Sequence, residues 1–173
     1  MSLGPSLACI GLMGKYDNPL HIAIFEPHSA VESAHLEFSF LLNASLDIFE
    51  LRASDRNRVD QDLGMLQAID ERLSTWGWQT GTGTKFAVIV DMWGKQGRPS
   101  TGSAIKGEDL KPVFKALQTA YIRLLQNPFY TPDDHTPMAA VRSRGSAGEI
   151  KSKKFIAEVK RIGDVWTPGL EKF

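Results

Sequence analysis

Two short segments of the chain are apolar at consecutive positions rather than at alternate ones: Leu7 to Met13 (LACIGLM) and Phe86 to Val90 (FAVIV). A β-strand points successive side chains to opposite faces, so strands of this composition need a sheet that is covered on both faces. An antiparallel sheet with one face in water would alternate apolar and polar residues instead. The pattern predicts a sheet enclosed between helices, with Phe86 to Val90 as a central strand.

Two turns and several further strands complete the predicted sheet. The turn residues Tyr16-Asp17-Asn18-Pro19 join the first strand to a second one over Leu20 to Phe25, which indicates a β-hairpin. Gly81-Thr82-Gly83 predicts a second hairpin turn. Three later strands are expected at 63–69, 75–80 and 85–90.

Three segments carry apolar residues at spacings of three and four, which predicts helices. They run from Ala30 to Leu51 with Ser29 as N-cap, from Glu108 to about Gln126, and from Ile150 to Trp166. Asn127-Pro128 ends the second, because the residue before a proline is disfavoured in a helix. The order is ββαβββαα, an α+β arrangement with long loops at 94–107 and 131–148. Each helix is expected to bury one apolar stripe. The stripe of the first helix is Val31, Ala34, Phe38, Leu41, Ser45 and Ile48; that of the second is Leu110, Val113, Phe114, Leu117, Tyr121, Leu124 and Leu125; and that of the third is Phe155, Ile156, Val159 and Ile162.

The first predicted helix has more apolar surface than one sheet contact needs. Leu36, Phe40 and Leu51 lie on a different face from its main stripe. This second face either serves a partner or is covered by a neighbouring loop.

Composition sets the broad class of protein. The 173 residues are 42% hydrophobic and 23% charged, which fits one globular domain with a real core. No apolar run approaches the roughly 20 residues of a bilayer helix, and the N-terminus lacks a basic region before an apolar block, so we expect a soluble, unsecreted protein. Cys9 is the single cysteine, which excludes an internal disulfide and a cysteine zinc cage. Its apolar strand predicts a buried thiol in a reducing cytosol.

The charges balance overall but not along the chain. With 20 basic and 20 acidic residues, nothing draws the whole molecule to nucleic acid or anionic lipid. Residues 1–60 nevertheless hold four Lys and Arg against eight Asp and Glu, whereas residues 140–173 hold eight against four. This asymmetry predicts two surfaces of different charge. A cluster of basic residues lies near the end of the chain: Lys151, Lys153, Lys154, Lys160 and Arg161. It either contacts an acidic partner or a membrane surface, or is simply the solvent-exposed face of a helix.

No motif meets the needs of a catalyst, a metal or a cofactor. The four histidines do not form His-Glu-x-x-His, and Asp133-Asp134-His135 stands alone in a loop. Gly81 to Lys85 precedes a strand rather than a helix, and Gly94-Lys95 is followed by glutamine instead of a hydroxyl, so neither fits a phosphate-binding loop. The sequence therefore shows no recognisable catalytic, metal or cofactor site.

The predicted order is that of longin-type domains, and specific motifs resemble the sedlin-like small subunits of the TRAPP (transport protein particle) vesicle-tethering complex, in particular the subunit 2-like branch. The resemblance covers nearly the whole chain. Its motifs are Ala8-Cys9-Ile10 with Lys15 to Leu20, Leu36-x-Phe38 with Ser45-Leu46-Asp47, Lys85-Phe86-x-x-x-Val90-Asp91, Phe114-x-x-Leu117-x-x-x-Tyr121, Asn127-Pro128-Phe129-Tyr130-x-Pro132 and Ile150-x-Ser152-x-x-Phe155-x-x-x-Val159.

The resemblance implies a longin fold, a five-stranded antiparallel sheet with one helix on one face and two on the other. It implies a non-catalytic adaptor in ER–Golgi and intra-Golgi traffic that supports assembly of a Rab GTPase exchange factor. The implied partners are other TRAPP subunits and, as a further possibility, SNARE proteins or Rab GTPases, but no nucleic acid. Contact with Golgi membranes would be at most peripheral, through the complex. The alternative is a stand-alone longin regulator that binds a SNARE or a small GTPase directly.

Five residues are candidates for partner binding. Asp47 lies among apolar residues, so we expect it to face a partner's cation or to accept local donors. Leu36 and Phe40 are candidates for an exposed contact patch. Phe129 and Tyr130 are expected to hold the loop that follows the second helix, with direct binding as the other reading.

Overall fold

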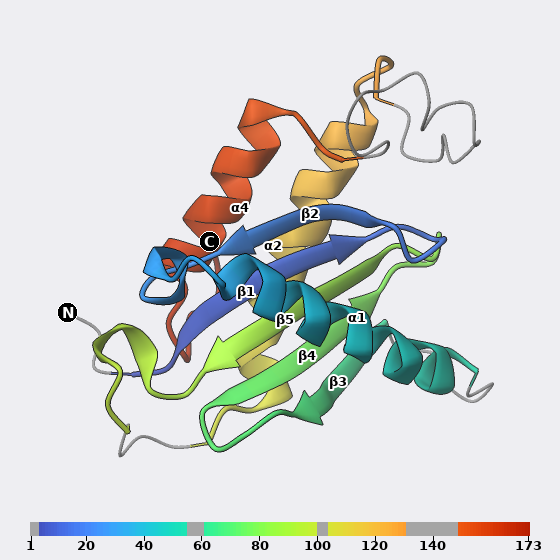
Figure 1. The fold of residues 1–173 in the computed structure, drawn as a ribbon. Coiled ribbons are helices and arrows are strands. Elements are labelled where there is room, and N and C mark those ends of the chain that lie inside the picture. Colours follow the sequence, from blue (N-terminus) through green and yellow to red (C-terminus); the bar gives the residue numbers. More distant parts are fainter. Residues whose placement is uncertain (1–3, 55–60, 100–103, 131–148) are drawn as a thin grey trace.

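The computed structural model describes residues 4–54, 61–99, 104–130 and 149–173, and its centre is a five-stranded antiparallel sheet. The strands lie in the order β2-β1-β5-β4-β3, so the first strand pairs with the last one at the centre (Figure 1). This position explains why the segments apolar on both faces are β1 and β5. The strands are β1 (Ser6–Met13), β2 (Pro19–Ile24), β3 (Asp62–Ala68), β4 (Leu73–Gln79) and β5 (Lys85–Asp91).

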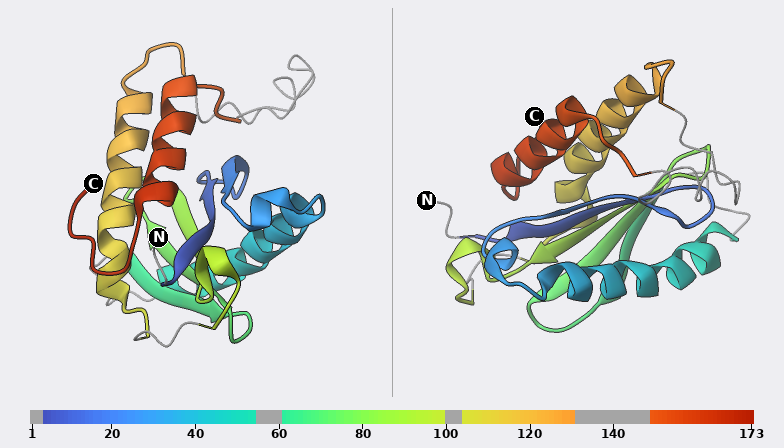
Figure 2. Two further views of the ribbon diagram at one scale, coloured as in Figure 1. Left: turned by 90° about the vertical axis from the view of Figure 1, so that its left-hand side faces the viewer. Right: turned by 45° about the horizontal axis from the view of Figure 1, so that its top comes forward.

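Helices cover both faces of the sheet, as predicted. Helix α1 (Ala34–Ala53) lies on one face, and α2 (Gly107–Leu125) and α4 (Lys153–Val165) lie side by side on the other (Figure 2). The predicted ββαβββαα order is therefore confirmed. This is an α+β fold of the longin type.

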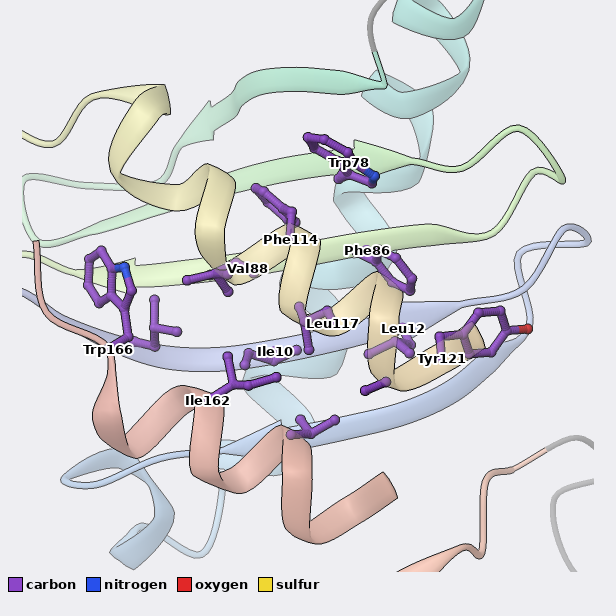
Figure 3. Packing of buried hydrophobic residues seen from close by; sticks show 14 of the residues in the cluster. Ile10, Leu12, Trp78, Phe86, Val88, Phe114, Leu117, Tyr121, Ile162 and Trp166 are labelled. Carbon is purple, nitrogen blue, oxygen red and sulfur yellow. The ribbon is translucent and has the colours of Figure 1, made fainter. Parts of the chain in front are cut away.

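The alternation of β5 shows how one strand serves two cores. Phe86 and Val88 point to the α2/α4 side, where they pack with Leu117, Tyr121 and Ile162 (Figure 3). Ala87 and Ile89, at the alternate positions of the strand, point to the α1 side and join a second, smaller cluster with Cys9. Burial raises the pKa of the Cys9 thiol, as the sequence led us to expect of a core cysteine.

Helix α4 approaches the sheet closely at one glycine. Gly163 is buried, and a Cβ placed there would lie 2.1 Å from the ring of Phe25. Phe25 follows β2 and is itself buried. A residue without a side chain is needed here because the ring occupies the space that a Cβ would fill.

Several predicted boundaries and stripe positions need correction. The first helix begins at Ala34 with Ser33 as N-cap, since a separate 3₁₀ turn at His28–Ala30 precedes it and Val31 is extended. Ser29 is therefore no N-cap, and Val31 lies outside the helix with 52% of its surface exposed. The predicted loop at 94–107 contains a 3₁₀ turn at Gly94–Gln96 and ends where α2 begins at Gly107. The loop at 131–148 lies outside the described residues.

Two positions assigned to apolar stripes face solvent. Leu125 is 40% exposed and Ile156 is 38% exposed, because each lies at the border of its helix's buried face. The other predicted positions of α2 and α4 are buried.

Candidate functional site

The outer face of α1 carries a row of exposed apolar side chains. Leu36, Phe40 and Leu51 are 63%, 67% and 73% exposed. Residues of an α-helix advance by about 100° each, so these positions fall within roughly 60° of one another on the helix surface. The buried residues of the same helix face the sheet; they are Ala34, Phe38, Leu42, Ser45 and Phe49. We call Leu36, Phe40, Asp47 and Leu51 the α1 stripe.

The α1 stripe is uncovered in the part of the chain that the structure describes. The predicted alternative, in which a neighbouring loop covers this face, is not what the described residues show. Burying a large apolar side chain fully stabilises an interface by about 1.5–3 kcal/mol. Three such side chains in one row therefore form a surface suited to a protein partner.

Asp47 lies within this row and is exposed. The helix turns it outward, on the same face as Leu36 and Phe40. No hydrogen bond or ion pair joins it to another described residue. Its carboxylate is therefore available to a cation of a partner, and Glu37 and Glu50 on the same helix are exposed as well.

Arg52, the basic residue in the last turn of α1, is directed elsewhere. Its guanidinium donates a hydrogen bond to the carbonyl oxygen of Leu63 in β3. The α1 stripe is consequently flanked by acidic groups, which favour a partner with basic residues around an apolar centre.

A cavity of about 340 Å³ lies beside the α1 stripe, between α1 and β2. Its walls are apolar side chains such as Leu42 and Leu46 from the helix and Ile22 from the strand. His21 and Glu149 also contact the cavity; burial lowers the pKa of His21, and the charge of Glu149 opposes this effect. The cavity widens the surface that a partner on α1 could contact.

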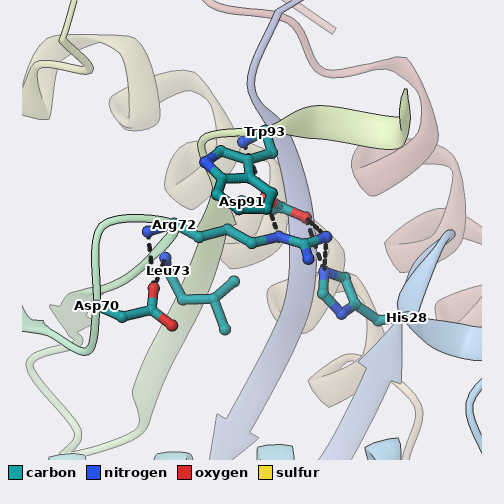
Figure 4. A network of polar contacts seen from close by, with 6 residues as sticks. All are labelled: His28, Asp70, Arg72, Leu73, Asp91 and Trp93. Atoms are coloured by element: carbon teal, nitrogen blue, oxygen red, sulfur yellow. Dashed lines mark hydrogen bonds and ion pairs between the residues drawn. The ribbon is translucent and has the colours of Figure 1, made fainter. Parts of the chain in front are cut away.

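The first turn before α1 is held in place by a polar network that the sequence analysis did not find. His28 Nε2 lies 2.8 Å from Oδ2 of Asp91, which is fully buried at the end of β5. Arg72, from the β3–β4 turn, donates to both oxygens of the same carboxylate, and its guanidinium lies over the ring of Trp93 (Figure 4). Asp70 accepts hydrogen bonds from the backbone N–H groups of Arg72 and Leu73 and so shapes that turn.

The carboxyl group of Asp91 is kept charged by this network. Burial alone would raise its pKa, but hydrogen bonds from His28, Arg72 and the backbone N–H of Trp93, together with the charge of Arg72, lower the pKa to about 2. Its function in this structure is to tie together β5, the β3–β4 turn and the entry to α1. The one indication of this network in the sequence was an aspartate directly after the apolar run Phe86 to Val90.

Phe129 and Tyr130 lie apart from the α1 stripe, after the end of α2 on the opposite face of the sheet. Tyr130 packs against the α2/α4 core, as expected of a residue that holds the following segment. Phe129 is 93% exposed, so its ring does not serve as an anchor among the described residues. The two neighbouring aromatic residues therefore have different roles.

The remaining predicted features are placed as follows. Gly81-Thr82-Gly83 forms the β4–β5 turn, with Thr80 and Thr84 joined by a backbone hydrogen bond. Within the described ranges no group of three His, Cys, Asp or Glu side chains could hold a metal ion. Asp133-Asp134-His135 lies outside those ranges. None of the described helices is both long and apolar enough to cross a membrane.

The fold defines a longin-type domain, and one of its helices has an exposed apolar face. Comparison with known proteins gives the family: the Sedlin family model matches residues 12–164, and the chain belongs to the sedlin family. The "Trafficking protein particle complex subunit 2-like protein" of Dictyostelium discoideum is 30% identical over 158 residues, covering 90% of this chain and 95% of that protein.

Animal proteins of the same name are also similar to this chain. The mouse protein is 28% identical over 131 residues, covering 73% of this chain and 84% of the relative, and the Bos taurus protein is 26% identical over 149 residues, covering 83% and 94%. The resemblance seen in the sequence motifs, to sedlin-like subunits of the 2-like branch, is confirmed.

Proposed function

We propose that this protein is a non-catalytic adaptor subunit of a TRAPP vesicle-tethering complex in ER–Golgi and intra-Golgi membrane traffic, and that it supports the assembly of a Rab GTPase exchange factor. Membership of the sedlin family and the names of its relatives support this role. The structural observation that carries the proposal is the α1 stripe, an exposed apolar row with a carboxylate inside it. The protein would reach Golgi membranes peripherally, through its complex, from the cytoplasm.

In this proposal the partner subunit covers Leu36 and Phe40, and Asp47 pairs with a cation on that subunit. The apolar side chains supply the binding energy, while the acidic group fixes the orientation. Phe129 is a second candidate contact on the opposite face, since its ring is almost entirely exposed. Tyr130 contributes by holding the segment from which Phe129 projects.

The first experiment is gentle purification of the tagged protein from its own cells, with mass spectrometry of whatever elutes in near-equal amounts. Recovery with several tethering subunits supports the adaptor role. Recovery alone, or with a single SNARE or small GTPase, would contradict it and favour a stand-alone longin regulator.

A set of variants then tests the surface. Leu36→Asp in the folded protein is expected to weaken assembly at least about tenfold, because it places a charge in an apolar contact. Ile122→Asp is the matched control, since Ile122 is an exposed apolar residue on α2, on the other side of the sheet. Equal assembly of the Leu36 variant and the wild type would remove the α1 stripe from the proposal.

Asp47 is tested separately with Asp47→Asn, which keeps the shape and removes the charge. Weaker assembly, together with a shallower dependence of affinity on salt, would support a cation opposite Asp47. Unchanged assembly at low salt would rule that cation out.

A further inference from the structure

A long trough runs between α2 and α4 on the face of the molecule opposite the α1 stripe. Two recesses, of about 660 Å³ and about 360 Å³, share Ala120, Arg123, Glu158 and Arg161, so they form one continuous depression. The lining residues on α2 extend from Pro112 to Leu124, which at 1.5 Å per residue corresponds to roughly 18 Å.

Small side chains create the trough. Ala116 and Ala120 on α2 and Ala157 on α4 line it, where longer side chains would fill the space between the helices. Leu124 and Phe155, both buried, supply an apolar floor. An amphipathic helix binds in a groove of this kind through its apolar face.

The lining of the trough is predominantly basic. It contains five cations, Lys115, Arg123, Lys154, Arg161 and Lys172, against two carboxylates, Glu158 and Glu171. Arg161 is paired with Glu158 by two hydrogen bonds. Lys115, Arg123 and Lys154 form no salt bridge with any other residue that the structure describes.

We propose that the trough between α2 and α4 binds an acidic, amphipathic helical segment of a partner protein, which packs apolar side chains on the trough floor and pairs its carboxylates with Lys115, Arg123 and Lys154. Charge complementarity carries this assignment, since the cations lie around a recess with an apolar floor. A membrane surface is a poorer match because lipid headgroups contact protruding cations and do not fill a trough. Of the basic cluster noted in the sequence, Lys154 and Arg161 line the trough, whereas Lys151, Lys153 and Lys160 lie outside it.

The test uses the protein by itself and a fluorescent peptide of about 16 residues, which as a helix of roughly 24 Å is long enough to span the trough. The peptide contains Leu at helical spacing with Glu and Ala elsewhere, and a second peptide has Gln at every Glu position. Selective binding of the Glu peptide is expected, with chemical-shift changes in NMR spectra confined to α2, α4 and the C-terminal residues. Equal binding of both peptides, or no binding at about 1 mM, would overturn the proposal.

Two kinds of variant make the test specific. Arg123→Glu with Lys154→Glu is expected to weaken binding of the Glu peptide at least about tenfold. Lys153→Glu with Lys160→Glu is the matched control, because it makes the same change of net charge at exposed positions outside the trough. An equal loss of peptide affinity in the two double variants would show that the peptide is held by general charge attraction, and would overturn the proposal.

Ala157→Leu tests the shape of the trough without changing charge. Ala157 is exposed, so the variant is expected to fold and to weaken peptide binding by obstructing the groove. Unchanged affinity in this variant would contradict binding in the trough. Binding to vesicles that contain phosphatidylserine is measured as the last experiment. If the protein binds these vesicles through Arg123 and Lys154 but does not bind the Glu peptide, the cations contact a membrane surface and the proposal is overturned. Because no tethering subunit takes part, failure here leaves the proposed role of the α1 stripe unaffected.

Discussion

Arg72 holds the carboxylate of Asp91 with two hydrogen bonds, from Nε to Oδ1 at 2.9 Å and from Nη2 to Oδ2 at 2.7 Å. A paired arrangement of this kind is both stronger and more directional than a single neutral hydrogen bond. Since His28 contacts the same carboxylate, one buried aspartate connects the last strand of the sheet to the segment that leads into α1. The connection thus fixes the 3₁₀ turn that precedes α1 to the end of β5.

Asp91→Asn is the direct test of the network. The amide keeps the shape but offers one acceptor oxygen where the carboxylate has two, so Arg72 and His28 lose partners in a partly buried place. We expect the free energy of unfolding to fall by about 2 kcal/mol, measured by urea unfolding with an unchanged m-value. Glu158→Gln is the control, because it removes an exposed ion pair and should change stability by no more than about 0.5 kcal/mol. Equal effects of the two variants would contradict a special role for Asp91.

The same pair predicts how stability depends on pH. The pKa of Asp91 is lowered from 3.8 to about 2 in the folded protein, so its carboxylate contributes stability that is fully present above the unfolded pKa and is lost as pH falls through the folded pKa. We expect the advantage of the wild type over Asp91→Asn to shrink by about 2 kcal/mol between pH 5 and pH 2. Unfolding curves of both proteins across this range are the measurement, and a constant difference would contradict the assignment.

The close approach of α4 to Phe25 gives a prediction about packing. Gly163→Ala improves the helix propensity of α4 but places a methyl group against a buried ring, and overpacking of this kind costs about 1–3 kcal/mol. Thermal unfolding should show a lower Tm. Combining the change with Phe25→Leu should recover part of the loss, because the smaller side chain leaves room for the methyl group. Gly81→Ala, where nothing lies within 4 Å of the added atom, serves as the control; a Gly163 variant as stable as this control would refute the packing argument.

The two aromatic residues after α2 are expected to respond differently to truncation. Tyr130→Ala should lower Tm because this side chain packs on the core, whereas Phe129→Ala should leave Tm unchanged because its ring is 93% exposed. Assembly with partner subunits is measured in parallel. Loss of assembly in the stable Phe129 variant would make this ring a binding residue, and a lower Tm in that variant would return it to the structural role expected from the sequence.

Local patterns were sufficient to predict the order of the helices and strands and a sheet covered on both faces. Consecutive apolar residues in β1 and β5 required a sheet covered on both faces, and helical spacing located α2 and α4 to within a few residues. The second apolar face of α1 likewise indicated the α1 stripe. These features are predictable because the period of a helix or strand fixes which side chains share a face.

Features that depend on tertiary contacts were not predictable. His28, Arg72 and Asp91 come from three separate segments, and no spacing in the sequence indicates that they meet. The entry to α1 was misplaced for the same reason, since a turn whose His28 is held by Asp91 lies before the helix begins. Phe129 and Tyr130 are adjacent aromatic residues, and their sequence context does not say which ring finds a place in the core.

Cys9 provides a probe of the intact fold. Its thiol is fully buried within the sheet, and burial raises its pKa, so both access and reactivity are suppressed in the native state. We expect labelling with a thiol reagent at pH 8 to be slow and to accelerate in urea in parallel with unfolding measured by circular dichroism. Gly163→Ala, which destabilises the fold without touching Cys9 directly, should label faster than the wild type under native conditions. Rapid labelling of the native wild type would contradict the burial of this residue, and equal rates in the two proteins would mean that labelling proceeds through a local opening that does not involve α4.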